Sequence, residues 1–173
     1  MGILTFFKKN KNKEAEKFTG SFSEWHKLVE DIVGNQYEVI PFDRIIEEFP
    51  DNYSSEYDPL LADAVGKLET YALKKTINSF NRVWNRGITE NDITCVKRAW
   101  LGFRNALQEC LFFRKCVGFP EDIAKQVENQ VVETAESIQA SCEKYIRRAE
   151  DESGSEFMKD IYYMIRRDKL QIR

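Results

Sequence analysis

The side chains most able to do chemistry in this chain are one histidine, His26, and four cysteines. Histidine-based metal motifs need at least two histidines. The cysteines stand 15, 6 and 26 positions apart, so none forms the CxxC pair of a zinc or redox site. No residue close to His26 in sequence supplies a nucleophile for a catalytic pair. We therefore expect neither a metal site nor a cofactor.

Motifs of the common enzyme classes are missing as well. The eight glycines are scattered, with no glycine-rich phosphate loop and no GxSxG turn. The adjacent carboxylates Glu47 and Glu48 would point about 100° apart on a helix, so they cannot face each other as general acid and base. Glu121 and Asp122 are explained by the favourable effect of acidic groups in a first helical turn. The sequence favours a protein that is not an enzyme.

The segment 21–58 is strongly acidic and rich in aromatic residues. It has ten carboxylates against two basic residues, a formal charge of −8. Tyr53 and Tyr57 lie in a stretch with no helical face to bury them, and tyrosines surrounded by carboxylates suit a basic protein partner. The ordinary alternative is a solvated loop whose tyrosines pack on the core. The candidate partner-binding residues are Tyr53, Tyr57, Glu47, Glu48, Asp51, Glu56 and Asp58.

A second candidate surface is basic. Lys75, Arg82 and Arg86 share one face of a predicted helix, and Lys97 and Arg98 begin the next helix across a short turn. Such a patch could bind phosphates. Two ordinary explanations compete, because basic groups near a helix C-terminus offset its dipole and the acidic segment 21–58 could cover them. We regard nucleic acid as an unlikely partner.

Residues 1–20 are interpreted as an N-terminal tail or short helix, and residues 21–173 as a single helical domain. The tail begins with the apolar residues of Ile3 to Phe7 and continues with lysines up to Lys13. Residues 1–13 could therefore make weak contact with a membrane surface, or pack on the rest of the protein. No apolar run is long enough for a transmembrane helix or resembles an export signal, so we expect a cytoplasmic protein.

Three long helical patterns decide the predicted fold. The first runs from Pro59 to Gly87, the second from Thr89 to Gly118, and the third from Pro120 to about Asp151. Long helices joined by short turns lie antiparallel to their neighbours. We expect an all-α antiparallel bundle of five to seven helices with a core of three long helices. The helix content should exceed about 60%.

Shorter helices are predicted over residues 23–34, over residues 41–49, and from about Ser155 onward, with Ser21 or Ser23 as the first cap. Apolar stripes at helical spacing mark the buried faces; they include Trp25, Leu68, Trp84, Trp100, Phe103, Val131, Tyr145 and Ile161. The cysteines are expected to be reduced packing residues. Cys110 and Cys116, on one continuous helix, would stand about 9 Å apart along its axis, beyond disulfide reach.

The resulting functional hypothesis is a non-catalytic protein-binding module, such as an adaptor, an inhibitor or an immunity-type protein. It would present its acidic, tyrosine-containing surface to a basic protein partner. The alternative is a peripheral membrane-associated or nucleic-acid-associated factor that uses the basic tail or the Lys75–Arg98 patch.

Overall fold

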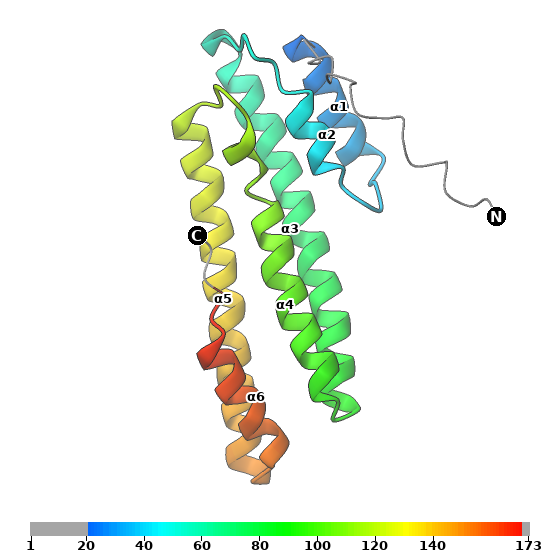
Figure 1. Ribbon diagram of the computed structural model, residues 1–173, viewed down its shortest axis with the longest axis vertical. Coiled ribbons are helices and arrows are strands. Elements are labelled where there is room, and N and C mark those ends of the chain that lie inside the picture. Colours follow the sequence, from blue (N-terminus) through cyan, green and yellow to red (C-terminus); the bar gives the residue numbers. More distant parts are fainter. Residues whose placement is uncertain (1–20, 171–173) are drawn as a thin grey trace, which may run out of the picture.

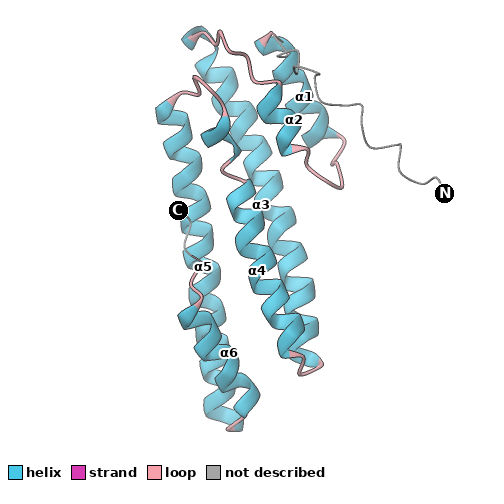
Figure 2. Cartoon of the chain, in the orientation of Figure 1, coloured by secondary structure: helices cyan, strands magenta, loops and turns pink. Residues whose placement is uncertain are grey.

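A computed structural model describes residues 21–170, which form six α-helices and two short 3-10 helices joined by turns (Figures 1 and 2). Helices account for 80% of the described residues and no strand occurs among them, so the predicted all-α bundle is confirmed. The expectations for the 1–20 tail lie outside this part of the chain. The elements are α1 (Phe22–Gly34), α2 (Phe42–Glu47), η1 (Ser55–Tyr57), α3 (Asp58–Thr89), α4 (Ile93–Glu109), η2 (Phe112–Lys115), α5 (Glu121–Ser153) and α6 (Glu156–Arg167).

The bundle is built from two long helical hairpins. α3 packs most closely against α4, and α6 folds back along α5 (Figure 1). The α1 and α2 helices cover the first half of α3, and α2 also contacts η2. The three long helices were expected to form the core, with the shorter helices packed against it. Within this bundle α5 has α6 as its closest neighbour, and its contacts with α3 and α4 are fewer.

Local capping explains where several helices begin. Ser21 and Glu24 form a reciprocal capping box at the start of α1, as the sequence indicates. The Ser155 hydroxyl accepts the first-turn amide of Met158 at the start of α6. Each cap satisfies amides that a helix end leaves without a partner.

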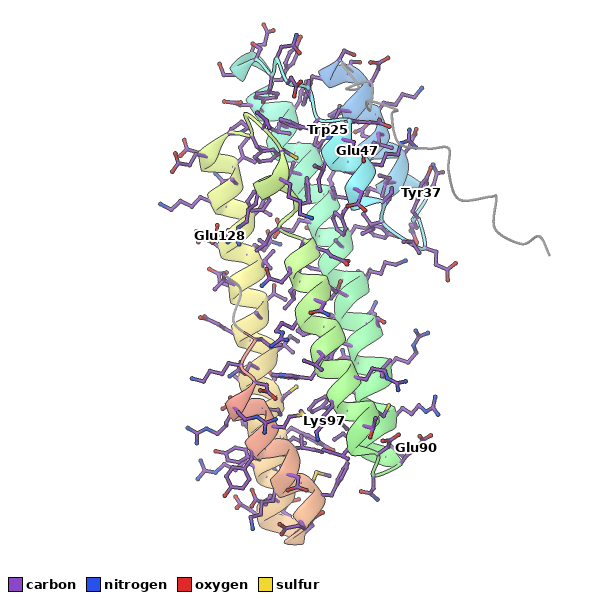
Figure 3. The ribbon with its side chains drawn as sticks, viewed as in Figure 1. Trp25, Tyr37, Glu47, Glu90, Lys97 and Glu128 are labelled. Carbon is purple, nitrogen blue, oxygen red and sulfur yellow. The ribbon has the colours of Figure 1, made fainter. Side chains whose placement is uncertain are left out.

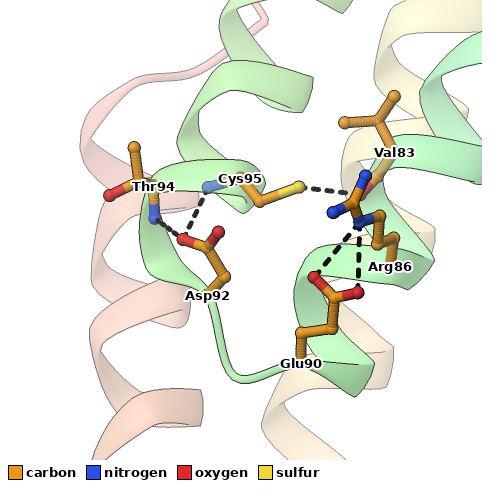
Figure 4. Close-up of polar contacts among 6 residues, drawn as sticks. All are labelled: Val83, Arg86, Glu90, Asp92, Thr94 and Cys95. Atoms are coloured by element: carbon orange, nitrogen blue, oxygen red, sulfur yellow. Dashed lines mark hydrogen bonds and ion pairs between the residues drawn. The ribbon is translucent and has the colours of Figure 1, made fainter.

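The turn between α3 and α4 differs from the prediction. α4 begins at Ile93, not at Thr89, because the Asp92 carboxylate accepts the amides of Thr94 and Cys95 at 2.9 and 3.0 Å (Figure 4). α3 continues past Gly87 to Thr89, so Gly87 does not end the helix. Gly87 is buried where the two helices meet: a Cβ there would lie 2.8 Å from Val96 Cγ2 and 2.9 Å from Val96 N.

This close approach predicts opposite effects for two glycines of the same helix. Gly87→Ala should lower the free energy of unfolding by about 1–3 kcal/mol, because the backbone of α4 must shift to make room. Gly66→Ala is the matched control, since a Cβ at Gly66 meets nothing within 4 Å. It should raise stability by about 0.5–1 kcal/mol through helix propensity. Urea melts of both variants measure the difference, and a gain in both would contradict the close packing at Gly87.

The second long helix was predicted to run to Gly118, which is wrong. α4 ends at Glu109, and the four consecutive residues 110–113 are all buried. A continuous α-helix would spread four successive side chains around its circumference and leave some in water. The chain instead turns into η2, where Phe112 packs on Phe42 and Phe119 at ring distances of 5.7 and 6.5 Å.

The break at Glu109 also separates two of the cysteines. Cys110 and Cys116 flank η2 and do not share one helix. All four cysteines are nevertheless free, as expected. Burial raises the pKa of the Cys116 and Cys142 thiols to about 12, so these groups behave as packing residues with little thiolate at neutral pH.

The predicted apolar stripes form one continuous core. Trp25, Trp100 and Ile161 are at most 1% exposed. Tyr145 is an error in the predicted stripe of α5: it is 54% exposed, and the neighbouring Ile146 is fully buried in its place. Ile146 follows the buried Cys142 by four residues, so the buried face advances by one helical turn.

Candidate functional site

Tyr53 and Asp58 of the acidic segment are bound to each other. The Tyr53 hydroxyl donates to Asp58 Oδ1 at 2.8 Å. Burial and this bond raise the pKa of Tyr53 above its usual value. Its ring stacks on Phe49 at 5.6 Å and meets Phe22 edge-on. No side chain caps the start of α3, and the Asp58 carboxylate there binds Tyr53.

Tyr57 is placed differently. It is 37% exposed, and its ring stacks on the buried ring of Phe22 at 4.8 Å. Leu60, three residues further along the chain, is 51% exposed. The start of α3 therefore presents an aromatic ring, held in position by Phe22, beside an exposed aliphatic side chain.

The carboxylates of the acidic segment remain mostly at the surface. Glu48 is half-buried and forms an ion pair with Arg44, in which Arg44 Nε lies 2.6 Å from Glu48 Oε1. Glu47, on α2 (Figure 3), is exposed, as are Asp51 and Glu56. The other exposed carboxylates of this segment are Glu24, Glu30, Asp31, Glu38 and Asp43. We call the exposed carboxylates of residues 21–58, together with Tyr57 and Leu60, the acidic end.

The predicted basic patch is divided by the structure. Lys75 turns toward the loop between α1 and α2, where its amine donates to the Tyr37 carbonyl oxygen at 3.0 Å. Arg86 Nε donates to both carboxylate oxygens of Glu90 at 3.1 Å, so the positive charge of Arg86 is paired within α3 and the turn that follows it (Figure 4). Arg82 is exposed on α3.

The two basic residues of α4 point to different neighbours. Lys97 lies on the side of α4 that faces α6 (Figure 3). Together with Arg104 it adds to the effect of Arg167, whose hydrogen bond is the main reason that the pKa of Asp168 is lowered. Arg98 lines a groove together with Lys75. Lys97 and Arg98 thus do not act as one surface.

That groove is a feature that the sequence interpretation missed. It has a volume of about 380 Å³ and lies between α3 and α4, below the loop between α1 and α2. Its size is within the range of about 300–1,000 Å³ that is usual for binding pockets. The groove is lined by Val39, Ile40, Phe42, Ala72, Lys75, Thr76, Ser79, Phe80, Val83, Arg98, Ala99, Gly102, Phe103, Ala106 and Glu109.

Small side chains shape this groove. Ala99, Gly102 and Ala106 recur at steps of three and four residues along α4, and Thr76 and Ser79 face them from α3. The spacing was visible in the sequence, but only the pairing of α3 with α4 makes the two rows into one surface. Three of the lining residues are charged: Lys75, Arg98 and Glu109.

A second feature without a prediction is the buried carboxyl of Glu69 on α3. Glu69 is 3% exposed, and its Oε1 has no hydrogen-bond partner within the described part of the chain. Burial raises its pKa from 4.5 to about 8. Burial and the negative charge of Glu69 raise the pKa of the Cys110 thiol to about 12. The sequence signal was its position, four residues after Val65 and four before Leu73 on the buried face.

The structure defines an all-α helical bundle with an acidic end and an apolar groove. Between residues 21 and 170 no helix combines the length and the apolar character needed to cross a bilayer. Comparison of the chain with known protein families, with curated proteins and with solved structures finds no match.

Proposed function

We propose that this protein is a non-catalytic protein-binding module, of the adaptor, inhibitor or immunity type, that presents its acidic end to a basic protein partner. The observation that supports this function best is the position of Tyr57. It is partly exposed, stacked on Phe22, and belongs to a segment whose carboxylates are mostly at the surface.

The physical argument rests on the separate roles of rings and charges in binding. An aromatic side chain that is already held in place loses little conformational entropy on binding, so its contact area contributes more fully to affinity. Exposed carboxylates around it accelerate encounter with a basic surface, and salt screens this effect. Four unpaired cysteines suit a reducing compartment such as the cytoplasm, which we include in the proposal.

The two tyrosines receive different roles in this proposal. Tyr57 is the candidate anchor for the partner. Tyr53 supports Tyr57 indirectly, because its ring packs on Phe22, the residue on which Tyr57 stacks. Tyr53 is itself fixed by its bond to Asp58 and by its packing on Phe49. Replacement of Tyr53 by alanine would disturb the core, so it is an unsuitable test of binding.

Binding kinetics of surface variants test the proposal. The partner is first isolated by pulldown with the full chain from its native source. Tyr57→Ala should then speed dissociation by about tenfold or more, because a buried ring acts mainly on residence time. The double variant Glu47→Lys and Glu56→Lys should slow association and weaken its dependence on salt.

A matched variant controls for effects on the fold. Tyr145→Ala removes another exposed tyrosine, from α5 and far along the chain from the acidic end, and should leave both rates unchanged. Rates that are the same for the wild type and for both acidic-end variants would refute the proposal. Binding to anionic vesicles that needs residues 1–13, or to nucleic acid that needs Arg82 and Arg98, would support the alternative function instead.

A further inference from the structure

The α3–α4 groove has a length and a lining that suit the binding of a third helix. Arg98 and Glu109, which both line it, are eleven residues apart on α4, which corresponds to about 16 Å at 1.5 Å per residue. A helix of about three turns has this length. Small side chains along both walls let another helix approach to the 8–10 Å axial distance that is typical of helix pairs.

Gly102 is the clearest sign that the floor of the groove is open. It lies in the middle of α4, where glycine is less favourable than alanine. The packing of α4 does not require it, because a Cβ at this position would meet nothing within 4 Å. At Gly87, in contrast, the close contact with Val96 explains the glycine. Because Gly102 also lines the groove, this open space would let the backbone of an incoming helix come close.

The charged residues that line the groove select the chemistry and the direction of the occupant. Lys75 and Arg98 supply two positive charges there, and Lys75 uses one of its three N–H groups on the Tyr37 carbonyl oxygen, which leaves two for a carboxylate. A bound helix that runs antiparallel to α4 would place its N-terminus, the positive end of its dipole, near Glu109. An occupant with carboxylates along one edge, running antiparallel to α4, satisfies all three groups.

We propose that the α3–α4 groove binds an acidic amphipathic helix of a partner protein. The helix places its apolar face over Gly102 and its carboxylates against Lys75 and Arg98. This mode of recognition, an amphipathic helix in an apolar groove, is common in protein complexes. The lysine-rich tail of this chain is a poorer occupant, because Lys8, Lys9, Lys11 and Lys13 would face two cations. The inference uses a surface separate from the acidic end and does not depend on it.

The test uses a synthetic helical peptide with the full-length protein. The probe has about 16 residues, with leucine and alanine on one face and glutamates along one edge of that face. Its control carries lysine in place of each glutamate. We expect fluorescence anisotropy to show at least about tenfold tighter binding of the acidic peptide, and NMR spectra to show shifts of the amide signals of Gly102 and its neighbours.

Two glycine variants locate the site. Gly102→Leu should fill the groove and weaken binding of the acidic peptide by at least about tenfold while the helix stays folded, since leucine is a better helix former than glycine. Gly66→Leu changes another open glycine, on α3 and outside the groove, and should leave binding unchanged. Arg98→Glu should weaken binding of the acidic peptide and strengthen that of the lysine control.

Three results would overturn the inference. The first is equal binding of both peptides, or no shift of the Gly102 amide at millimolar peptide. The second is a shift of the groove amides when residues 1–13 are deleted without any peptide present, which would make the tail the occupant. The third is a dimer of the full chain that Gly102→Leu dissociates, which would make a second copy the occupant. None of these results bears on Tyr57 or on the proposed function.

Discussion

Trp100→Ala is expected to lower the free energy of unfolding by about 3–5 kcal/mol, a large part of the stability of a domain of this size. Trp100 is 1% exposed and packs against Phe80 and Trp84 at ring distances of 6.1 and 5.8 Å. Its indole Nε1 also donates to the carbonyl oxygen of Asp168 at 2.6 Å. The variant therefore leaves a cavity between the hairpins and an acceptor without its donor.

The hydrogen bond joins the two hairpins at the end of α6. Next to it, the Leu170 amide donates to Gln139 Oε1 at 2.9 Å, and the Leu170 side chain is buried. Trp100→Ala should release this terminal segment, so the amide of Leu170 should exchange with solvent much faster than in the wild type. Hydrogen exchange followed by NMR measures this local effect separately from global unfolding.

Two further variants separate the contributions at this position. Trp100→Phe keeps an aromatic ring and removes the N–H, so its loss of stability should be smaller, about 1–2 kcal/mol. Leu101→Ala changes the neighbouring residue, which is 44% exposed, and should cost less than about 1 kcal/mol. Guanidinium melts of the three variants provide the comparison. A loss below about 1 kcal/mol for Trp100→Ala would contradict the burial of this side chain.

Glu69→Gln is expected to stabilise the protein at neutral and alkaline pH, which is unusual for a substitution at a buried position. In the folded protein burial raises the pKa of Glu69 from 4.5 to about 8. The unfolded chain releases this proton near pH 4.5, and the folded chain holds it up to about pH 8. The unfolded state therefore binds fewer protons across this range, and stability must fall as the pH rises.

The size of the effect follows from the two pKa values. The Glu69 carboxyl makes its full contribution to the free energy of unfolding below pH 4.5, and this contribution is lost progressively up to about pH 8. At about 1.4 kcal/mol per pH unit the total loss is on the order of 3–5 kcal/mol. Glutamine cannot ionise, so Glu69→Gln should remove this slope. Its advantage over the wild type should be about 2–4 kcal/mol at pH 7 and near zero at pH 4.

Urea melts at a series of pH values from 4 to 9 check the prediction. Glu133→Gln, on the exposed face of α5, is the control for removing a carboxylate and should change stability by less than about 0.5 kcal/mol at pH 7. Parallel pH profiles for the wild type and Glu69→Gln would show that the carboxyl of Glu69 reaches water in the folded protein.

The regular helices were predictable because the interactions that form them are local. The capping box at Ser21 and the cap at Ser155 involve residues within three positions of each other. The apolar stripes, which identify Trp25, Trp100 and Ile161 as core residues, depend only on the 3.6-residue period of a helix. These signals are sufficient for an all-α bundle and for most of its buried faces.

The errors at the helix ends have tertiary causes. α4 stops at Glu109 because Phe112 packs on Phe42, a residue 70 positions earlier in the chain. The residue at position 87 of α3 is a glycine because Val96 of α4 leaves no room for a Cβ there, and not because the helix ends. No pattern around Phe112 or Gly87 alone contains these contacts, since each requires knowledge of which elements meet.

The functional surfaces follow the same division. From the sequence by itself one could identify the acidic composition of residues 21–58 and its tyrosines, because charge and residue type are local properties. Only the tertiary structure separated Tyr57, stacked and partly exposed, from Tyr53, which is bound to Asp58. It likewise divided the basic patch, buried the Glu69 carboxyl and created the groove over Gly102. Each of these depends on which faces of distant helices are brought together, and helical periodicity gives the faces of a helix without giving its neighbours.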